Sequence, residues 1–254
     1  MSDDMKIADY LAQGGVLTSP GNVPPRYRAE LMRLMASFVD SELAGAAGFA
    51  DIINQGPGVK ERIAAAKIVM EKTDHADQIL TLMGQFGTNT DRYANYHPWT
   101  ERLDRDAPIG TNRTNSDMRL AVFNYPLNGW TDAVAMNMLM GKAVGVQLSE
   151  YAMISYQPLA EAVRKIMPRE TRHTELAEEG MAKLVQDRTQ KAALKESVAY
   201  WWPRVESSFG SDASNRFEPL QKMGLRKLTN KELRDKWRAE ASTVLAGLDL
   251  PVPD

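Results

Sequence analysis

The sequence predicts an all-α protein: a bundle of four long helices with additional helices at its C-terminal end. Apolar residues recur every three or four positions over long stretches, and no stretch shows the strict alternation typical of a β-strand. Of the 254 residues, 43% are hydrophobic, which is enough for one substantial core. The 14 methionines also favour a helical core, because methionine fills irregular spaces between helices.

Boundary signals mark the first two long helices. Residues 1–25 contain several Gly and Pro and predict an N-terminal arm. The arm leads into a helix over about 27–54, which the turn sequence at 55–58 ends. A second helix follows over about 59–86, and Gly87 provides its C-terminal cap.

A long polar loop over about 88–122 separates the two halves of the bundle. A loop of this length either has a function or covers the core. The third helix is predicted over about 130–153. The fourth begins at Pro158, because proline suits the first turn of a helix. The bundle itself is therefore assigned to residues 26–188.

Residues 189–254 are predicted to cover the bundle. One helix is expected over about 189–207. Another begins after Thr229, which forms a capping box with Glu232, and ends near Gly247.

Composition excludes several classes of partner. The 31 basic and 33 acidic residues are interspersed, so neither a nucleic acid nor a membrane surface is expected to bind. The most apolar segment, 133–148, is too short and too polar to span a bilayer. The N-terminus lacks the features of a signal peptide. The chain has no cysteine, so a cytoplasmic location is expected.

Charged and polar residues interrupt the apolar stripes of three predicted helices. They are Glu42 on the first, Lys72 and His75 on the second, and Glu170 and His173 on the fourth. Burying such groups without partners would cost several kcal/mol. We therefore expect them to neutralise one another or to bind a ligand.

Glu170 and His173 form a Glu-x-x-His motif whose side chains share one face of a helix. Ferritin-like carboxylate metal proteins use two such motifs, plus one carboxylate from each of two other helices, to hold two metal ions. The second motif here has Lys72 in place of glutamate, followed by His75, and the stripe of the third helix carries no acid.

Two interpretations of Lys72 follow. In the first, its ammonium group pairs with Glu42 and Glu170 in an internal ion cluster that replaces the metal. In the second, the metal ligands have shifted. Glu71 lies four residues before His75 and a π-bulge could bring it into the site, and Asp74 is a further candidate ligand.

The chain also resembles the catalytic-type subunit of phenylacetyl-CoA epoxidase, in the phenylacetic acid catabolic family, from Pro24 to Pro253. The segments that carry the resemblance are Tyr27-Arg28, Ser41-Glu42, the helix ending in His75, Phe123-Asn124-Tyr125-Pro126, Trp130 with Asp132, Ser155-Tyr156 with Pro158, Glu170 to His173, Trp201-Trp202-Pro203, and Thr229-Asn230 with Glu232-Leu233-Arg234.

The resemblance implies a ferritin-like bundle and a non-haem di-iron oxygenase that epoxidises the ring of an aromatic acyl-CoA, in a complex with a related subunit and a reductase. The implied metal ligands fall on Glu42, His75, Glu170 and His173. Two ligand positions differ: Lys72 replaces a glutamate and Gly141 replaces an aspartate, with Lys142 beside it. Pro168 adds an expected kink before Glu170.

Three functional hypotheses follow. The preferred one is a non-catalytic scaffold subunit of an aromatic acyl-CoA oxygenase that holds little or no metal. The second is a divergent non-haem iron oxygenase with shifted ligands. The third is a bundle that binds an acyl-CoA without turnover. The expected partners are a related ferritin-like oxygenase subunit, further copies of the chain, or both.

Overall fold

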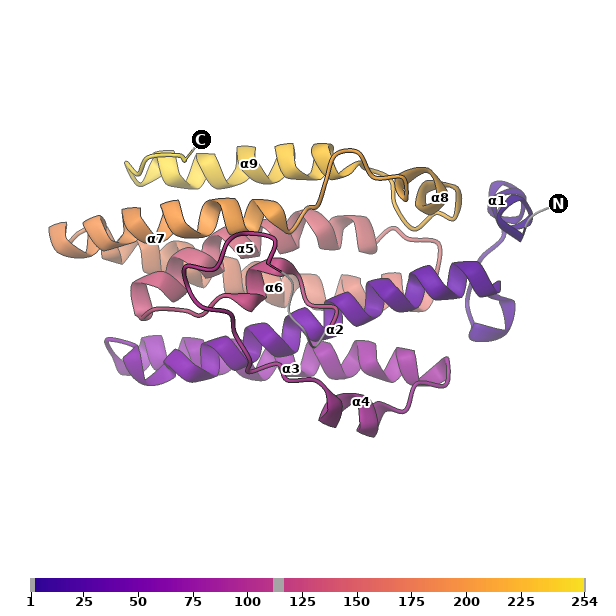
Figure 1. The fold of residues 1–254 in the computed structure, drawn as a ribbon, viewed down its shortest axis with the longest axis horizontal. Helices are drawn as coiled ribbons and strands as arrows, with labels where there is room; N and C mark the ends of the chain where they lie inside the picture. The colour runs from indigo at the N-terminus through magenta and orange to yellow at the C-terminus, as the bar shows by residue number, and fades with distance from the viewer. Residues whose placement is uncertain (1–2, 112–116, 254) are drawn as a thin grey trace.

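The computed structural model describes residues 3–111 and 117–253, in which helices run side by side along one long axis (Figure 1). Within these residues no β-strand forms, apart from an isolated bridge between Leu17 and Tyr156. The all-α prediction is confirmed. The elements, in chain order, are α1 (Asp3–Ala12), η1 (Pro20–Asn22), α2 (Pro25–Ile52), η2 (Ile53–Gln55), α3 (Val59–Gln85), α4 (Thr90–Tyr96), η3 (Ala121–Asn124), α5 (Trp130–Tyr151), α6 (Gln157–Leu184), α7 (Arg188–Ser207), α8 (Phe217–Lys222) and α9 (Asn230–Gly247).

Two helix pairs form the bundle. α2 packs along α3, α5 packs along α6, and the contact of α3 with α6 joins the pairs. The C-terminal helices α7 and α9 pack against α5, so they lie on the far side of the bundle from α2 and α3 (Figure 1). Trp201, Trp202 and Trp237 are buried in the same apolar cluster as the α5 side chains.

The six long helices begin and end within a few residues of the predicted positions. Thr229 caps α9 and forms the expected capping box with Glu232. Gly87 follows α3 with a φ of 89°, a conformation that favours glycine. Pro168 is exposed and lies inside α6, which continues through it.

The sequence did not predict three short helices. α1 lies in the expected N-terminal arm, α4 in the long loop, and α8 between the last two long helices. None exceeds 10 residues. Periodicity cannot identify helices that short, and most of their stability must come from packing on the bundle.

The long connection between α3 and α5 is fastened to the bundle through buried polar groups of α2. Asp40 on α2 accepts hydrogen bonds from the Tyr93 hydroxyl at 2.7 Å and the Met118 amide at 2.6 Å. Burial raises the pKa of Asp40, against the effect of these hydrogen bonds. Next to Asp40, the Ser41 hydroxyl accepts a hydrogen bond from the Leu120 amide at 3.0 Å. The connection therefore closes over α2 beside Glu42.

No helix in the described part of the chain combines the length and the hydropathy that crossing a membrane requires.

Candidate functional site

Lys72 lies at the centre of the candidate site. Its side chain points from α3 into the bundle and is 5% exposed. Its Nζ lies 2.9 Å from Glu42 Oε1 on α2, and 3.2 and 3.1 Å from the two carboxylate oxygens of Glu170 on α6. One ammonium group thus joins three helices.

His75, one turn further along α3, contacts the same two carboxylates. Its Nδ1 lies 2.9 Å from Glu170 Oε1 and 3.2 Å from Glu42 Oε2. Burial would lower the pKa of His75, but hydrogen bonds to both carboxylates outweigh it and raise the pKa to about 9. The imidazole is therefore cationic at neutral pH. Its Nε2 is buried and makes no hydrogen bond within the described residues.

The four groups compensate one another electrically. Burial opposes the charge on Lys72, but attraction to Glu170 and Glu42 raises the pKa of its ammonium group. Burial would raise the pKa of Glu170, but Lys72 and the neighbouring histidines hold it well below its ordinary value. Two carboxylates and two cations therefore form a neutral set, which we call the ion cluster (Glu42, Lys72, His75 and Glu170).

Glu71 is buried beside this cluster and binds His173, the second histidine of the candidate site. Its carboxylate lies 2.7 Å from His173 Nε2. The Nδ1 of His173 lies 3.3 Å from Glu170 Oε1 but is not oriented for a hydrogen bond. α3 brings Glu71 there without a π-bulge, since it is α-helical throughout. The neighbours Glu71 and Lys72 thus bind two different partners on α6.

Asp74 and Lys142 do not join the cluster. Asp74 lies on the exposed side of α3, where it pairs with Arg169 and accepts a hydrogen bond from Gln78 at 2.9 Å. Lys142 points to the outside of α5 and pairs with Glu178 at 2.6 Å.

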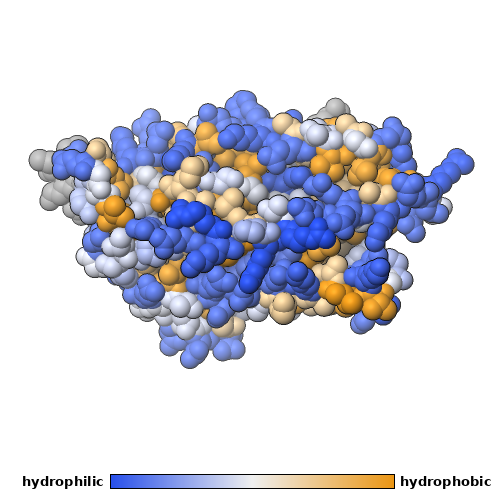
Figure 2. Space-filling view, turned by 180° about the vertical axis from the view of Figure 1, so that it is seen from behind, coloured by the Kyte–Doolittle hydropathy of each residue, from blue (hydrophilic) through white to orange (hydrophobic). Residues whose placement is uncertain are grey.

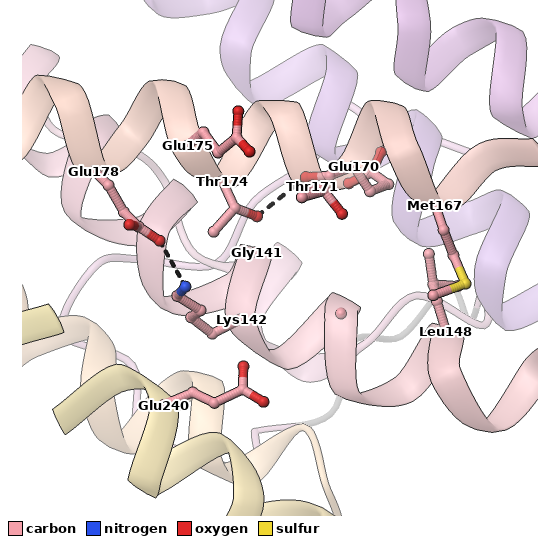
Figure 3. A pocket seen from close by; sticks show the side chains of 11 residues that line it. Gly141, Lys142, Leu148, Met167, Glu170, Thr171, Thr174, Glu175, Glu178 and Glu240 are labelled. Carbon is pink, nitrogen blue, oxygen red and sulfur yellow. Dashed lines mark hydrogen bonds and ion pairs between the residues drawn. The ribbon is translucent and has the colours of Figure 1, made fainter. Parts of the chain in front are cut away.

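Thr174 fills the space in front of Gly141. A Cβ atom at Gly141 would lie 2.3 Å from Thr174 Oγ1 and 3.0 Å from Thr174 Cβ. The Thr174 hydroxyl donates to the carbonyl oxygen of Glu170 at 3.1 Å, one turn earlier (Figure 3). No side chain fits at position 141 unless Thr174 moves, and no sequence pattern indicates this contact.

A groove of about 350 Å³ runs along the outside of this contact, between α5, α6 and α9. Gly141 and Gly145 line it on α5, and Lys142 pairs with Glu178 across it (Figure 3). Glu240 of α9 lies on its opposite side. Its acidic lining makes it a poor site for an anionic ligand.

These residues do not fit a pair of metal ions. Among the described residues, Glu42, His75 and Glu170 are the only group of three with ligand atoms close enough to share an ion, within 4.8 Å of one another. The Lys72 ammonium group lies within hydrogen-bond distance of both carboxylates in that group. A metal ion and this ammonium group would compete for the same oxygens, and Thr174 excludes a further ligand at position 141.

Two neighbouring cavities lie near Glu42, which lines the inner one. The inner one is narrow, about 30 Å³, and apolar, with Phe38, Phe123 and Met140 in its wall. The outer one holds about 250 Å³ and is lined by Arg33, Arg216 and Arg226. Ser37 and Tyr151 line both cavities. No sequence motif indicates that these residues line a cavity, because they come from segments far apart in the chain.

Comparison with known proteins gives two findings. A family model described as phenylacetic acid catabolic protein matches residues 16–254. A curated relative from Escherichia coli (strain K12), one of the subunits of 1,2-phenylacetyl-CoA epoxidase, is 23% identical over 258 residues, covering 100% of this chain and 78% of the relative.

Replacing Lys72 should destabilise the fold strongly at neutral pH. In Lys72→Met, Glu42 and Glu170 keep only His75 as a shared cation, and breaking a buried ion pair costs about 3–5 kcal/mol. The loss should shrink on acidification. A carboxylate with a lowered pKa stabilises the fold above its ordinary pKa and loses that contribution as pH falls, so the parent loses what the variant already lacks.

Urea unfolding of both proteins at neutral and acidic pH measures this difference. Lys60→Met is the matched control, because Lys60 is exposed on the same helix. A Lys72 variant as stable as its control at pH 7 would contradict the ion cluster.

Proposed function

Because this chain belongs to the phenylacetic acid catabolic protein family, we propose that it is a non-catalytic subunit of a system that oxidises the ring of an aromatic acyl-CoA. The observation that carries the proposal is the hydrogen bonding of the buried Lys72 ammonium group to both Glu42 and Glu170. The ion cluster takes over the charge compensation that bound metal would otherwise supply.

The physical argument concerns what a buried carboxylate requires. Two carboxylates facing each other in a core must share a proton, bind a cation, or separate. Lys72 supplies that cation covalently from α3. A metal ion would have to displace an ammonium group held by three hydrogen bonds and would then lie beside an unpaired buried positive charge.

A divergent oxygenase with shifted ligands has less support. Glu71 already binds His173, and Asp74 faces outward to Arg169. Neither residue compensates for the missing ligands at positions 72 and 141.

A related ferritin-like oxygenase subunit is the proposed partner. The relative from E. coli is itself described as one subunit of an epoxidase, so the proposal extends to this chain the role of one subunit among several.

Acyl-CoA binding without turnover is a second candidate, favoured by the two neighbouring cavities near Glu42. Their outer part offers Arg33, Arg216 and Arg226, which match phosphate groups. The inner part is apolar, as an acyl group requires, although it would have to widen to admit an aromatic ring.

The purified protein should contain well under one iron per chain, both as isolated and after incubation with ferrous iron. The ligands are too few and Lys72 occupies their centre. Elemental analysis gives the ratio directly. Two irons per chain would refute the proposal and favour the divergent oxygenase.

Metal binding should be restored only when three positions change together. Lys72→Glu with Gly141→Asp supplies the missing carboxylates, but the new aspartate collides with Thr174. Adding Thr174→Ala removes the colliding hydroxyl group. We expect iron binding in the triple variant and not in the double variant.

Iron content and metal-induced thermal stabilisation of both variants check this expectation. A double variant that binds iron as well as the triple variant would show that Thr174 does not block position 141.

Phenylacetyl-CoA should bind the parent protein more tightly than phenylacetate does, because the arginine-lined cavity recognises the phosphate groups. Arg33→Ala should weaken this binding roughly tenfold, since a hydrogen bond to a charged group contributes about 1.5–3 kcal/mol. Isothermal titration calorimetry measures both affinities. Arg172→Ala, on the distant outer face of α6, should leave them unchanged. Equal losses in the two variants would argue against this cavity.

A further inference from the structure

Asp40 of α2 holds two separate segments of the connection between α3 and α5. Its Oδ1 accepts a hydrogen bond from the Tyr93 hydroxyl at 2.7 Å and a longer one from Trp99 Nε1 at 3.4 Å. Its Oδ2 accepts one from the Met118 amide at 2.6 Å. Asp40 is fully buried, so these donors replace water around the carboxylate. One side chain therefore fastens both segments to α2.

Arg119 joins the two segments into one unit. Its guanidinium group donates hydrogen bonds to the carbonyl oxygens of Pro98 at 2.8 Å and of Trp99 and Glu101 at 3.1 Å. It also pairs with Asp117, which precedes it by two residues. Arg119 is buried, and these contacts satisfy its charge inside the connection. We call this unit the strap (residues 93–102 and 117–120).

The strap is attached to α2 at two further places. The Ser41 hydroxyl accepts a hydrogen bond from the Leu120 amide at 3.0 Å, and the Ala44 carbonyl oxygen accepts one from Arg102 at 2.8 Å. Each of these bonds can be released without breaking a hydrogen bond inside a helix. The strap is thus held on the bundle more weakly than the helices beneath it are held together.

The strap completes the wall of the inner cavity. α2 and α5 make few contacts with each other, and both of them line this cavity. Leu120 of the strap contributes to the same wall as Ser41 and Glu42. Met118, two residues earlier, lines the outer cavity. Lifting the strap from α2 would therefore remove part of the wall of both cavities.

The surroundings of the strap allow it to move outward. Directly after it, the Leu103 amide donates to the Asn124 carbonyl oxygen at 2.7 Å and Arg105 pairs with Asp132 of α5 at 2.8 Å, so the chain is fixed there. The connection crosses the front of the bundle (Figure 1), and from behind α4 forms a largely hydrophilic protrusion below it (Figure 2). Outward movement therefore displaces no helix of the bundle.

We propose that the strap is a gate over the inner cavity and that Asp40 is its latch. When the strap leaves Asp40 and Ser41, the two cavities join beside Glu42 and admit an apolar group as large as an aromatic ring, which the closed cavity of about 30 Å³ is too narrow to hold. The proposal rests on the acyl-CoA candidate only for the identity of the group that enters.

A single introduced cysteine measures the opening directly, because the chain has no cysteine of its own. Met140 lies in the wall of the inner cavity and is 3% exposed, so Met140→Cys should react slowly with iodoacetamide. Adding Asp40→Asn leaves one acceptor oxygen for three donors and should speed the reaction about tenfold or more. Tyr93→Phe should have a smaller effect in the same direction. Asp51→Asn, exposed on α2, is the matched control and should have none.

A second buried cysteine separates opening of the gate from loosening of the whole fold. Leu245 of α9 is fully buried and lines neither cavity, so Asp40→Asn should leave the reaction of Leu245→Cys unchanged. The proposal is overturned if Asp40→Asn does not speed the reaction of Met140→Cys. It is also overturned if both buried cysteines react faster by the same factor, because Asp40 would then support the whole fold.

Hydrogen exchange provides a measurement that needs no cysteine. The amides of Met118 and Leu120 should exchange about tenfold faster or more in Asp40→Asn than in the parent, while amides in the middle of α5 keep their rates. Unchanged exchange at Met118 and Leu120 would contradict the latch. No acyl-CoA enters these experiments, so a gate that does not open and a ligand that does not bind give separate results.

Discussion

The hydrogen bonds from Lys72 to Glu42 and Glu170 are the interaction on which the centre of this bundle depends. They connect α2, α3 and α6, and without them the two buried carboxylates would share one cation, His75, instead of two. The ammonium group of Lys72 neutralises the carboxylates as a bound cation would, but it is covalently attached to α3 and cannot dissociate. The centre of the bundle is therefore complete as soon as the chain folds.

Neighbouring positions have adapted to that arrangement. The Glu71 carboxylate accepts a hydrogen bond from His173 Nε2. This histidine therefore keeps a buried partner, although its Nδ1 is not oriented for a hydrogen bond to Glu170. Thr174 occupies the space in front of Gly141 and closes the gap between α5 and α6. Each departure from the ligand pattern is thus matched by a protein group nearby.

Much of the fold and part of the site could be predicted from the sequence. The six long helices are long enough for apolar periodicity to identify them, and the polar residues on their stripes identified the ion cluster. The partner of Glu71 and the outward orientation of Asp74 could not be predicted. Successive residues lie about 100° apart around a helix, so a small error in the assumed orientation of α3 exchanges a buried position for an exposed one. Thr174 and the arginine-lined cavity depend on contacts between helices, which no local pattern records.

The charge balance of the buried carboxylates explains how this bundle keeps its fold with lysine at position 72. If position 72 held an uncharged residue, Glu42 and Glu170 would share only the His75 cation, and the buried cluster would carry an unbalanced negative charge. If it held glutamate, a third carboxylate would make a metal ion necessary for stability. Lysine alone among these choices balances the charges without a ligand. The stability of this bundle and its proposed loss of metal therefore have the same cause.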